Sequence, residues 1–264
     1  MNLGWLTDLH INFMRPEVFR AFLEMLKGHP AEVFVITGDI GEAHSCALYL
    51  KTIADAVQRP VYFVLGNHDF YQGSFAEVHA RVRATVAAHK HLVWLRDAGA
   101  LELTRATALV GHDAWGDTRL GDFEHTQVML NDFLLIDDLR GAPISVRDKL
   151  LALGDEAAAH LREHLPKAFE THAQVILALH VPPFQAAAWH QGKPSDDNWV
   201  PFFACKAAGD AILDLMRARP DRKLTVLCGH THSPGEYRPL PNVTVLTGAA
   251  EYGSPVIQRV MEVE

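Results

Sequence analysis

The segment Pro60–Asp69, PVYFVLGNHD, joins an apolar run to a cluster of polar side chains. The run 60–65 has the length and the β-branched and aromatic content of a buried strand. Gly66 and Asn67 then favour a tight exit from that strand, because both residue types tolerate unusual backbone angles. The segment is either a simple turn or a place where metal ligands and proton donors stand at a strand end, and the rest of the chain decides between the two.

Apolar runs of strand length alternate with longer helical patterns along the chain. Strands are predicted at 2–6, 32–37, 60–65, 107–111, 174–179, 224–228 and 243–248, with an edge strand within 255–264. Helices are predicted at 16–27, 43–58, 74–89, 146–165 and 207–218. This alternation predicts an α/β layered fold, and two sets of strands fit a two-sheet sandwich flanked by helices.

The size and charge of the chain restrict its class. With 264 residues and 48% hydrophobic content, the chain can bury one large core, so a single domain over 1–264 is predicted. The formal net charge of −8 argues against unspecific nucleic-acid binding, which depends on a basic surface. A small anionic substrate is still compatible with an acidic protein if metal ions supply a local positive field.

The cysteines and the N-terminus indicate the expected setting of the protein. Cys46, Cys205 and Cys228 are widely spaced and odd in number, so neither a disulfide framework nor a Cys-x-x-Cys metal motif is predicted. The N-terminus lacks a basic region followed by an apolar run, and no apolar stretch approaches the length of a membrane span. We therefore expect a cytoplasmic protein with no membrane partner.

Most of the predicted strands end in Asp, Asn or His. In α/β sheets the carboxyl ends of the strands form the ligand-binding crevice, so these side chains are expected to meet. Taken singly, each is more often a turn residue, a helix cap or a buried histidine. Seven of them, taken together, suit a pair of Mn, Fe or Zn ions. These are two carboxylates, four imidazoles and one amide oxygen, from Asp8, Asp39, His10, His180, His230, His232 and Asn67. The side chains at these strand ends are Asp8, His10, Asp39, Asn67, His68, Asp69, His112, Asp113, His180, His230 and His232.

A His-x-His pair is not by itself evidence of a metal site in this chain, because the chain has 16 histidines. About one His-x-His is expected by chance at this composition, and the chain has two, at 89–91 and 230–232. The first pair flanks Lys90 at a predicted helix end and is predicted to be solvated surface. The second pair follows Gly229 at the end of a buried strand and is predicted to bind metal.

The ligand-type residues form ordered blocks that resemble those of the calcineurin-like metallophosphoesterases. The blocks are Asp8-x-His10, Gly38-Asp39, Gly66-Asn67-His68-Asp69, His180 and Gly229-His230-Thr231-His232. The resemblance implies a four-layer α/β/β/α sandwich with two divalent or trivalent metal ions. It implies that Asp8, His10 and His232 bind the first metal, and that Asn67, His180 and His230 bind the second. It also implies that Asp39 bridges both ions.

The resemblance also implies a mechanism. A water molecule activated by the metals attacks phosphorus in line, while the metals bind the phosphoryl oxygens. His68 stands beside Asn67 but outside the ligand set, and it is expected to stabilise the transition state or to protonate the leaving oxygen. Asp69 is expected to orient His68 through a hydrogen bond, as carboxylates do for other catalytic imidazoles.

The residues within these blocks indicate which class of phosphoesterase the chain resembles. Protein serine/threonine phosphatases carry Gly-Asp-x-x-Asp-Arg-Gly and Gly-Asn-His-Glu, whereas this chain has GDIGE at 38–42 and GNHD at 66–69. The chain is more similar to a bacterial group that includes cyclic-nucleotide and glycerophosphodiester phosphodiesterases. A small-molecule phosphodiesterase is therefore favoured over a phosphomonoesterase. The alternatives are a non-catalytic scaffold that binds a protein partner, which should have lost ligands, and a hydrolase of other esters, which the block order disfavours.

Two segments are expected to set the specificity. The charged segment 113–143 has no clear strand pattern and is predicted to be an insertion or cap. The loop 181–203 follows a predicted metal ligand directly, so it must lie near the site. A homo-oligomer is compatible with the sequence but not indicated by it. The side chains predicted to contact substrate are His112, Trp189 and Trp199, with Phe202 as a further aromatic, and the alternative is that they only pack the body.

Overall fold

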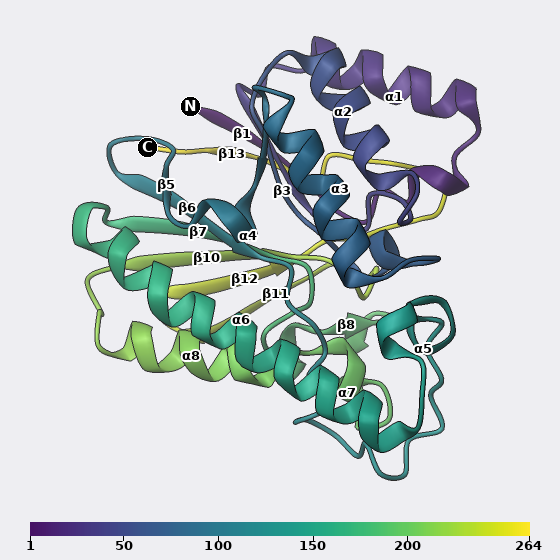
Figure 1. The fold of residues 1–264 in the computed structure, drawn as a ribbon. Helices are drawn as coiled ribbons and strands as arrows, with labels where there is room; N and C mark the ends of the chain where they lie inside the picture. Colours follow the sequence, from purple (N-terminus) through teal and green to yellow (C-terminus); the bar gives the residue numbers. More distant parts are fainter.

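The computed structural model describes residues 1–264 as two mixed β-sheets that pack face to face between two layers of helices (Figure 1). The strand order is β13-β1-β2-β3-β4 in the first sheet and β11-β12-β10-β7-β6-β5 in the second. Helices α1, α2 and α3 cover the first sheet, and α6 and α8 cover the second (Figure 1). The four-layer α/β/β/α arrangement that the resemblance implies is confirmed.

The strands are mostly parallel at the centre of each sheet and antiparallel at the edges. The first sheet contains β1 (Asn2–Leu6), β2 (Val33–Thr37), β3 (Val61–Val64), β4 (Leu92–Trp94) and β13 (Arg259–Glu262). The second contains β5 (Leu101–Glu102), β6 (Thr107–His112), β7 (Gln174–Leu179), β10 (Lys223–Cys228), β11 (Gly235–Leu240) and β12 (Val243–Thr247). A separate hairpin is formed by β8 (Trp189–His190) and β9 (Lys193–Pro194).

Four of the five predicted helices begin and end within three residues of the predicted limits, whereas the helix predicted at 146–165 continues six residues further, through Pro166. The long ones are α1 (Pro16–Gly28), α2 (Cys46–Val57), α3 (Phe75–Ala87), α6 (Pro143–Thr171) and α8 (Lys206–Arg217). The short ones are α4 (Leu95–Ala98), α5 (Asp132–Leu135) and α7 (Val200–Phe203), with 3₁₀ turns η1 (Ile11–Phe13), η2 (Asn67–Phe70), η3 (Asp137–Leu139) and η4 (Gln185–Ala187). Pro16 and Pro143 occupy the first turns of α1 and α6, where proline is preferred. A Ser74–Glu77 capping box starts α3.

The core consists of three apolar layers. One lies between the first sheet and its helices, one between the second sheet and its helices, and the third between the two sheets. Every residue of β2 is buried, which agrees with a parallel strand covered on both faces. This rigid frame fixes where the strand ends lie.

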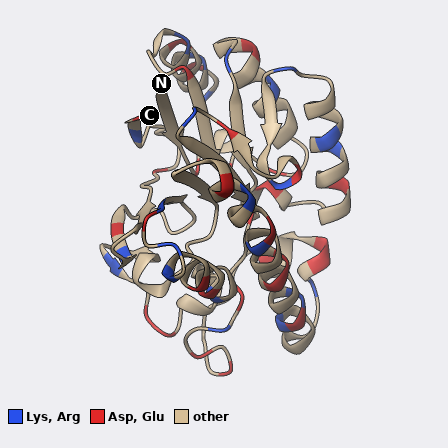
Figure 2. Cartoon of the chain, turned by 90° about the vertical axis from the view of Figure 1, so that its left-hand side faces the viewer, with Lys and Arg blue, Asp and Glu red and all other residues tan.

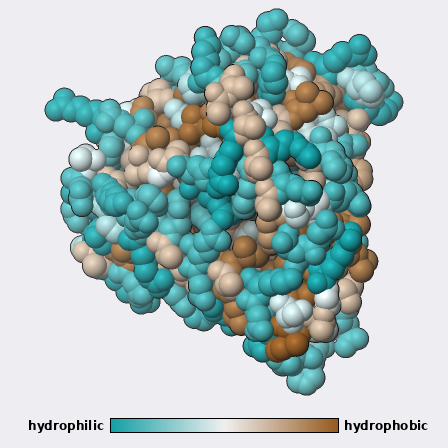
Figure 3. All heavy atoms as spheres, in the orientation of Figure 1, coloured by the Kyte–Doolittle hydropathy of each residue, from teal (hydrophilic) through white to brown (hydrophobic).

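The segment 113–143 and the loop 181–203 lie together beside the ends of the strands, with α5, α7 and the β8–β9 hairpin (Figure 1). The segment 113–143, predicted to be an insertion, docks on the residues that follow the Gly66–Asp69 block: Gln72 N–H donates to Leu135 O at 2.8 Å, and Asp137 N–H donates to Gly73 O at 3.0 Å. It exposes apolar side chains, including Met129 at 71% and Leu134 at 60%. Hydrophobic residues, brown in Figure 3, show at several places on that face, including its lower part.

The charged side chains are mixed on the surface. Lys and Arg alternate with Asp and Glu along the helices in Figure 2, and neither sign gathers into a single large face in that view. None of the helices combines the length and the apolar character that crossing a membrane requires.

Candidate metal centre

The carboxyl ends of five strands meet at one edge of the sandwich. From the first sheet, β1 leads to Asp8 and His10, β2 to Asp39 and β3 to Asn67, while β7 and β10 supply the histidines of the second sheet. Two carboxylates connect these loops, because Asp8 Oδ1 accepts the His230 N–H at 2.9 Å and Asp39 Oδ1 accepts the His68 N–H at 2.9 Å. The structure therefore brings all seven predicted ligands into one place.

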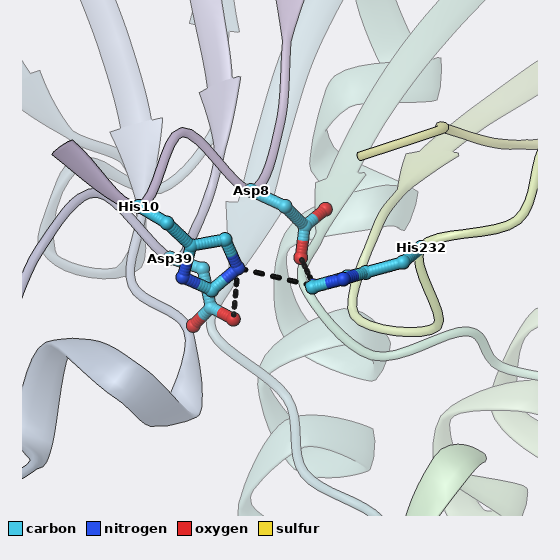
Figure 4. A group of neighbouring side chains, drawn as sticks. All are labelled: Asp8, His10, Asp39 and His232. Atoms are coloured by element: carbon cyan, nitrogen blue, oxygen red, sulfur yellow. Dashed lines mark hydrogen bonds and ion pairs between the residues drawn. The ribbon is translucent and has the colours of Figure 1, made fainter. Parts of the chain in front are cut away.

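The first group of ligand atoms comes from Asp8, His10, Asp39 and His232 (Figure 4). One ligand atom of each residue lies within 4.8 Å of the others. His10 Nε2 is 3.0 Å from His232 Nε2 and 3.6 Å from Asp39 Oδ2, and His232 Nε2 is 3.6 Å from Asp8 Oδ1. Separations of 3.6 Å are too long for hydrogen bonds but suit groups that share a cation.

The second group comes from Asn67, His180 and His230. Asn67 Oδ1 lies 3.0 Å from His180 Nε2 and 3.0 Å from His230 Nδ1, and the two ring nitrogens are 3.2 Å apart. Asn67 follows β3, His180 follows β7 and His230 follows β10, so three different strands position this group.

The outer partners of the second group define its protonation. His180 Nδ1 faces the Thr37 carbonyl oxygen at 2.9 Å, and His230 Nε2 faces the Phe202 carbonyl oxygen at 3.2 Å. A carbonyl only accepts, so these nitrogens carry the protons and the opposite nitrogens present lone pairs. Asn67 Oδ1 is also only an acceptor, so three lone pairs converge with no hydrogen between them. This donor set fits a metal cation with N and O ligands.

Asp39 is the one predicted ligand that faces both groups. Its Oδ2 lies 3.6 Å from His10 Nε2, and its Oδ1 lies 3.5 Å from His180 Nε2. Burial, with the charge of Asp8, raises the pKa of the Asp39 carboxyl well above its usual range. Burial also lowers the pKa of His180. A buried carboxylate among neutral imidazoles needs a positive partner, and cations bound in both groups would supply it.

The backbone at this edge is strained. Positive φ angles occur at Asp8 (46°), His10 (43°), Asp39 (53°), His230 (69°) and His232 (58°), which are half of the non-glycine residues with this conformation. The left-handed conformation costs a non-glycine residue about 1–2 kcal/mol and is often found at functional sites.

Two glycines permit the close approach of the loops. A Cβ atom on Gly66 would lie 2.1 Å from Asp39 Oδ1, and a Cβ atom on Gly229 would lie 2.0 Å from Asp8 Oδ2. Any side chain at either position would therefore displace a predicted metal ligand.

His68 lines a cleft of about 730 Å³ that opens beside both groups. Its ring stacks on Tyr71 at 4.2 Å and meets the edge of His10 at 4.5 Å between centroids. Burial, with the nearby imidazoles of His180 and His232, lowers the pKa of His68 to about 3. The ring is therefore neutral near pH 7, and it can donate a hydrogen bond from one nitrogen.

Asp69 has a different role from the predicted one. Its Oδ1 accepts the N–H groups of Ile40 (2.9 Å) and Gly41 (2.8 Å), and its Oδ2 accepts that of Gly66 (2.9 Å). The expected hydrogen bond to His68 is absent, so the prediction that Asp69 orients this ring is wrong. Its carboxylate points into the body and fixes the loops after β2 and β3.

The cleft is bounded by residues 127–132 of the insertion, parts of the loop 181–203 and Tyr252. Trp199, one of the predicted substrate contacts, lines it in an aromatic group with His190 (4.9 Å) and Phe203 (5.2 Å between centroids). The polar side chains that line the cleft are mainly amides and hydroxyls, and no Lys or Arg lines the cleft.

Three of the predicted substrate contacts lie outside this cleft. His112 is 2% exposed, its Nδ1 accepts the Ala114 N–H, and its ring packs against His160 of α6 at 5.0 Å. Trp189 packs against Gly235 at the start of β11, and Phe202 is buried in the core. These positions argue against direct substrate contact, because their side chains face the body.

The pair His89 and His91 lies outside both metal groups, as predicted. His89 is only 11% exposed, however, and its Nε2 lies 3.0 Å from Asp55 Oδ1. The prediction of a fully solvated pair is wrong for His89, because the end of α3 packs near α2.

Other cleft residues were not predicted as site residues. Asp132 is 5% exposed and accepts hydrogen bonds from Asn67 Nδ2 (2.8 Å) and the Tyr71 hydroxyl (2.7 Å). Tyr252 packs against His10 at 4.6 Å and His232 at 5.3 Å between centroids. The sequence signal for Asp132 was slight, since it is one of several acidic residues in a segment with no periodic pattern.

Comparison with known proteins supports the resemblance. A family model described as calcineurin-like phosphoesterase matches residues 1–234. The UDP-2,3-diacylglucosamine hydrolase of Pseudomonas paraeruginosa is 28% identical over 163 residues, which cover 57% of this chain and 63% of that protein. The protein of the same name from Pseudomonas putida is 27% identical over 191 residues, with 63% and 75% coverage. The chain thus spans less than two thirds of the first of these relatives.

Solved structures share the fold. A phosphopantetheinyl hydrolase from Mycobacterium tuberculosis aligns with a TM-score of 0.71 at 16% identity, over 96% of this chain and 90% of that chain. A dimetal phosphatase from Danio rerio aligns with a TM-score of 0.57 at 15% identity, over 94% and 87%. At these identities the likeness supports the architecture alone.

Proposed function

Because the chain belongs to the calcineurin-like phosphoesterase family, we propose that it hydrolyses phosphate esters of small molecules at the centre described above. The observation that carries the proposal is the convergence of three lone pairs from Asn67, His180 and His230. Asp8, His10 and His232 would hold a first ion, these three residues a second, and Asp39 would touch both. Mn, Fe and Zn all suit this mixture of oxygen and nitrogen ligands.

Two such ions, when bound, supply an activated water molecule and positive charge for the phosphoryl oxygens. The residues of the chain have complementary tasks. The seven ligands hold the positive charge at the floor of the cleft, and the insertion and the loop 181–203 enclose the leaving group. Tyr71 supports the His68 ring by stacking on it.

His68 is proposed to act as a neutral hydrogen-bond donor. Its lowered pKa of about 3 makes an imidazolium scarce near neutral pH. Of the two roles expected from sequence, donation to a phosphoryl or leaving oxygen in the transition state therefore agrees better with the structure than proton transfer from an imidazolium. A donor placed in this way stabilises charge that develops during the reaction.

The charge of the cleft favours phosphodiesters over phosphomonoesters. A diester carries one negative charge at neutral pH and a monoester carries close to two. Apart from the proposed ions, the cleft offers no Lys or Arg to balance a second charge, and the carboxyl group of Asp132 lies in its wall. Trp199, His190 and Phe203 could pack against an apolar or heterocyclic group of the ester.

The complete ligand set favours an enzyme over the non-catalytic scaffold considered above. The test is hydrolysis of bis-p-nitrophenyl phosphate and p-nitrophenyl phosphate by the protein loaded in turn with Mn, Fe and Zn. We expect turnover with at least one metal, and a higher kcat/KM for the diester. Inertness toward both esters with all three metals would overturn the proposal.

The natural ester requires a broader panel with the best metal. The panel contains 2′,3′- and 3′,5′-cyclic nucleotides, glycerophosphodiesters, nucleotides, sugar phosphates and UDP-2,3-diacylglucosamine, the last because relatives are named for it. A preference for dianionic monoesters would contradict the assignment from cleft charge while leaving the metal-dependent hydrolysis intact.

A further inference from the structure

We infer that Asp132, carried by the insertion 113–143, is a positioning residue that holds the Asn67 amide with its oxygen toward His180 and His230. The inference rests on the proposed metal site, but not on which ester is cleaved. It gives the insertion a part in building the second ligand group, in addition to covering the cleft.

An asparagine amide can present either its oxygen or its nitrogen to a neighbour. The lone pairs of His180 Nε2 and His230 Nδ1 both lie 3.0 Å from the position of Asn67 Oδ1. Without a metal, the reversed amide would be better bonded on this side, because its N–H groups could donate to both nitrogens. That orientation would point N–H groups at the ion and abolish the ligand.

The other side of the amide opposes this reversal. Asp132 Oδ1 accepts from Asn67 Nδ2 at 2.8 Å, and reversal would put the amide oxygen against a carboxylate oxygen. The Tyr71 hydroxyl lies 2.7 Å from Asp132 Oδ1 and 3.4 Å from Asn67 Nδ2. The hydroxyl donates to Asp132, so it also presents a lone pair to the amide. The hydroxyl could rotate and donate to a reversed amide, whereas Asp132 Oδ1 already accepts from both the amide and the hydroxyl, so Asp132 has the decisive role.

Asp132 is itself held in place. It is the first residue of α5, it is 5% exposed, and the insertion around it is bonded to Gln72 and Gly73 through backbone hydrogen bonds. These bonds lie just after the Gly66–Asp69 block that carries Asn67. The position of the carboxylate is thus fixed relative to the amide that it orients.

The test compares Asp132→Asn with Asp138→Asn. Both replacements are nearly isosteric and both lie in the insertion, but Asp138 Oδ2 accepts the Phe75 N–H at 2.7 Å and takes no part in the Asn67 contact. The readouts are metal content per chain and affinity for each ion, measured with Mn and Zn by competition with a chelator. We expect Asp132→Asn to keep one ion and to bind the other about 10–100-fold more weakly. Asp138→Asn should bind both ions as the parent does.

A double variant separates orientation from folding. In Asn67→Asp combined with Asp132→Asn, the new carboxylate presents an oxygen to the metal whichever way it turns. Residue 132 can then donate to its second oxygen. We expect the double variant to recover most of the affinity that Asp132→Asn loses, and to bind two ions again.

Parent-like affinity for both ions in Asp132→Asn would overturn the inference. So would an equal loss in Asp138→Asn, which would assign the effect to docking of the insertion, or a double variant that binds no better than Asp132→Asn. Failure of the proposed function looks different, because a parent protein that binds two ions but hydrolyses no ester would leave these metal measurements unaffected.

Discussion

His180 Nε2 and His230 Nδ1 lie 3.2 Å apart with no proton between them. Each ring donates its own proton to a backbone carbonyl on the opposite side, so the two lone pairs face each other and the oxygen of Asn67. Such a contact is unfavourable in the bare protein and becomes favourable around a cation. The stability of the fold should therefore depend on bound metal.

Removing metal is expected to lower the melting temperature. A ligand at a thousand times its Kd stabilises the folded state by about 4 kcal/mol, which corresponds to about 10 °C for a chain of this size. Differential scanning fluorimetry before and after chelation measures the change, and adding back Mn, Fe or Zn should reverse it. An unchanged melting temperature after verified metal removal would count against the site.

Asp39→Asn is expected to lose metal from both positions and to lose activity with it. The reason is that its two oxygens face different ligand groups, at 3.6 Å from His10 Nε2 and 3.5 Å from His180 Nε2. The comparison is His232→Ala, which should weaken only the first position. Elemental analysis of both variants measures the difference, and two ions in Asp39→Asn would contradict a bridging role.

His68→Ala is expected to keep both ions but to lower kcat about 10²–10³-fold, the usual effect of removing one donor to the transition state. His68→Asn retains an N–H donor and should recover part of this loss. His89→Ala serves as the control, because that ring pairs with Asp55 away from the cleft. Full activity in His68→Ala would remove the proposed role without affecting the metal assignment.

Gly66→Ala and Gly229→Ala are expected to abolish metal binding and to destabilise the fold. The new Cβ atoms would stand 2.1 Å from Asp39 Oδ1 and 2.0 Å from Asp8 Oδ2, respectively. Gly28→Ala is the matched control, since no atom lies within 4 Å of the position that its new methyl group would take and the residue ends α1. That change should be neutral or stabilising by up to about 1 kcal/mol in chemical denaturation.

The metal-free protein is expected to lose stability as the pH falls below about 6.5, the usual pKa of histidine. Burial lowers the pKa of His79 and His160 to about 4 in the folded state. Between about pH 4 and 6.5 the unfolded chain therefore binds more protons, so the free energy of unfolding rises with pH across this window. Urea denaturation at pH 5 and 7 measures it, and His160→Gln should reduce the difference. Equal stability at both pH values would contradict these lowered pKa values.

The strand-end positions of the candidate ligands could be predicted because these residues follow apolar strands, whereas their assignment to two metal ions came from the resemblance of the ordered blocks. The runs before Asp39, Asn67 and His180 are buried at all or all but one of their positions, so their patterns are strong and their ends are well defined. The layered fold follows from the same runs. Strands β4, β5, β8 and β9 were missed because they have only two or three residues, too few to show a pattern. Strand β11 was missed because its sequence, GEYRPL, has no apolar run and contains a proline.

The walls of the cleft could not be predicted in the same way. Asp132 and Phe203 lie in the short helices α5 and α7, and Tyr252 lies in a loop far away in the sequence, so their meeting depends on tertiary packing. Asp69 was misassigned because adjacency to His68 in sequence says nothing about direction, and the 3₁₀ turn sends the two side chains different ways. His112 stands at a strand end like the ligands, but β6 lies further along the second sheet than β7 and β10.

The left-handed backbone at Asp8, His10, Asp39, His230 and His232 makes the centre a region of local frustration. These five residues have a Cβ atom and adopt a backbone conformation that only glycine adopts without strain. The surrounding sandwich must therefore hold the loops in this conformation before any ion binds. The centre is thereby rigid in advance, which favours fast and selective metal uptake.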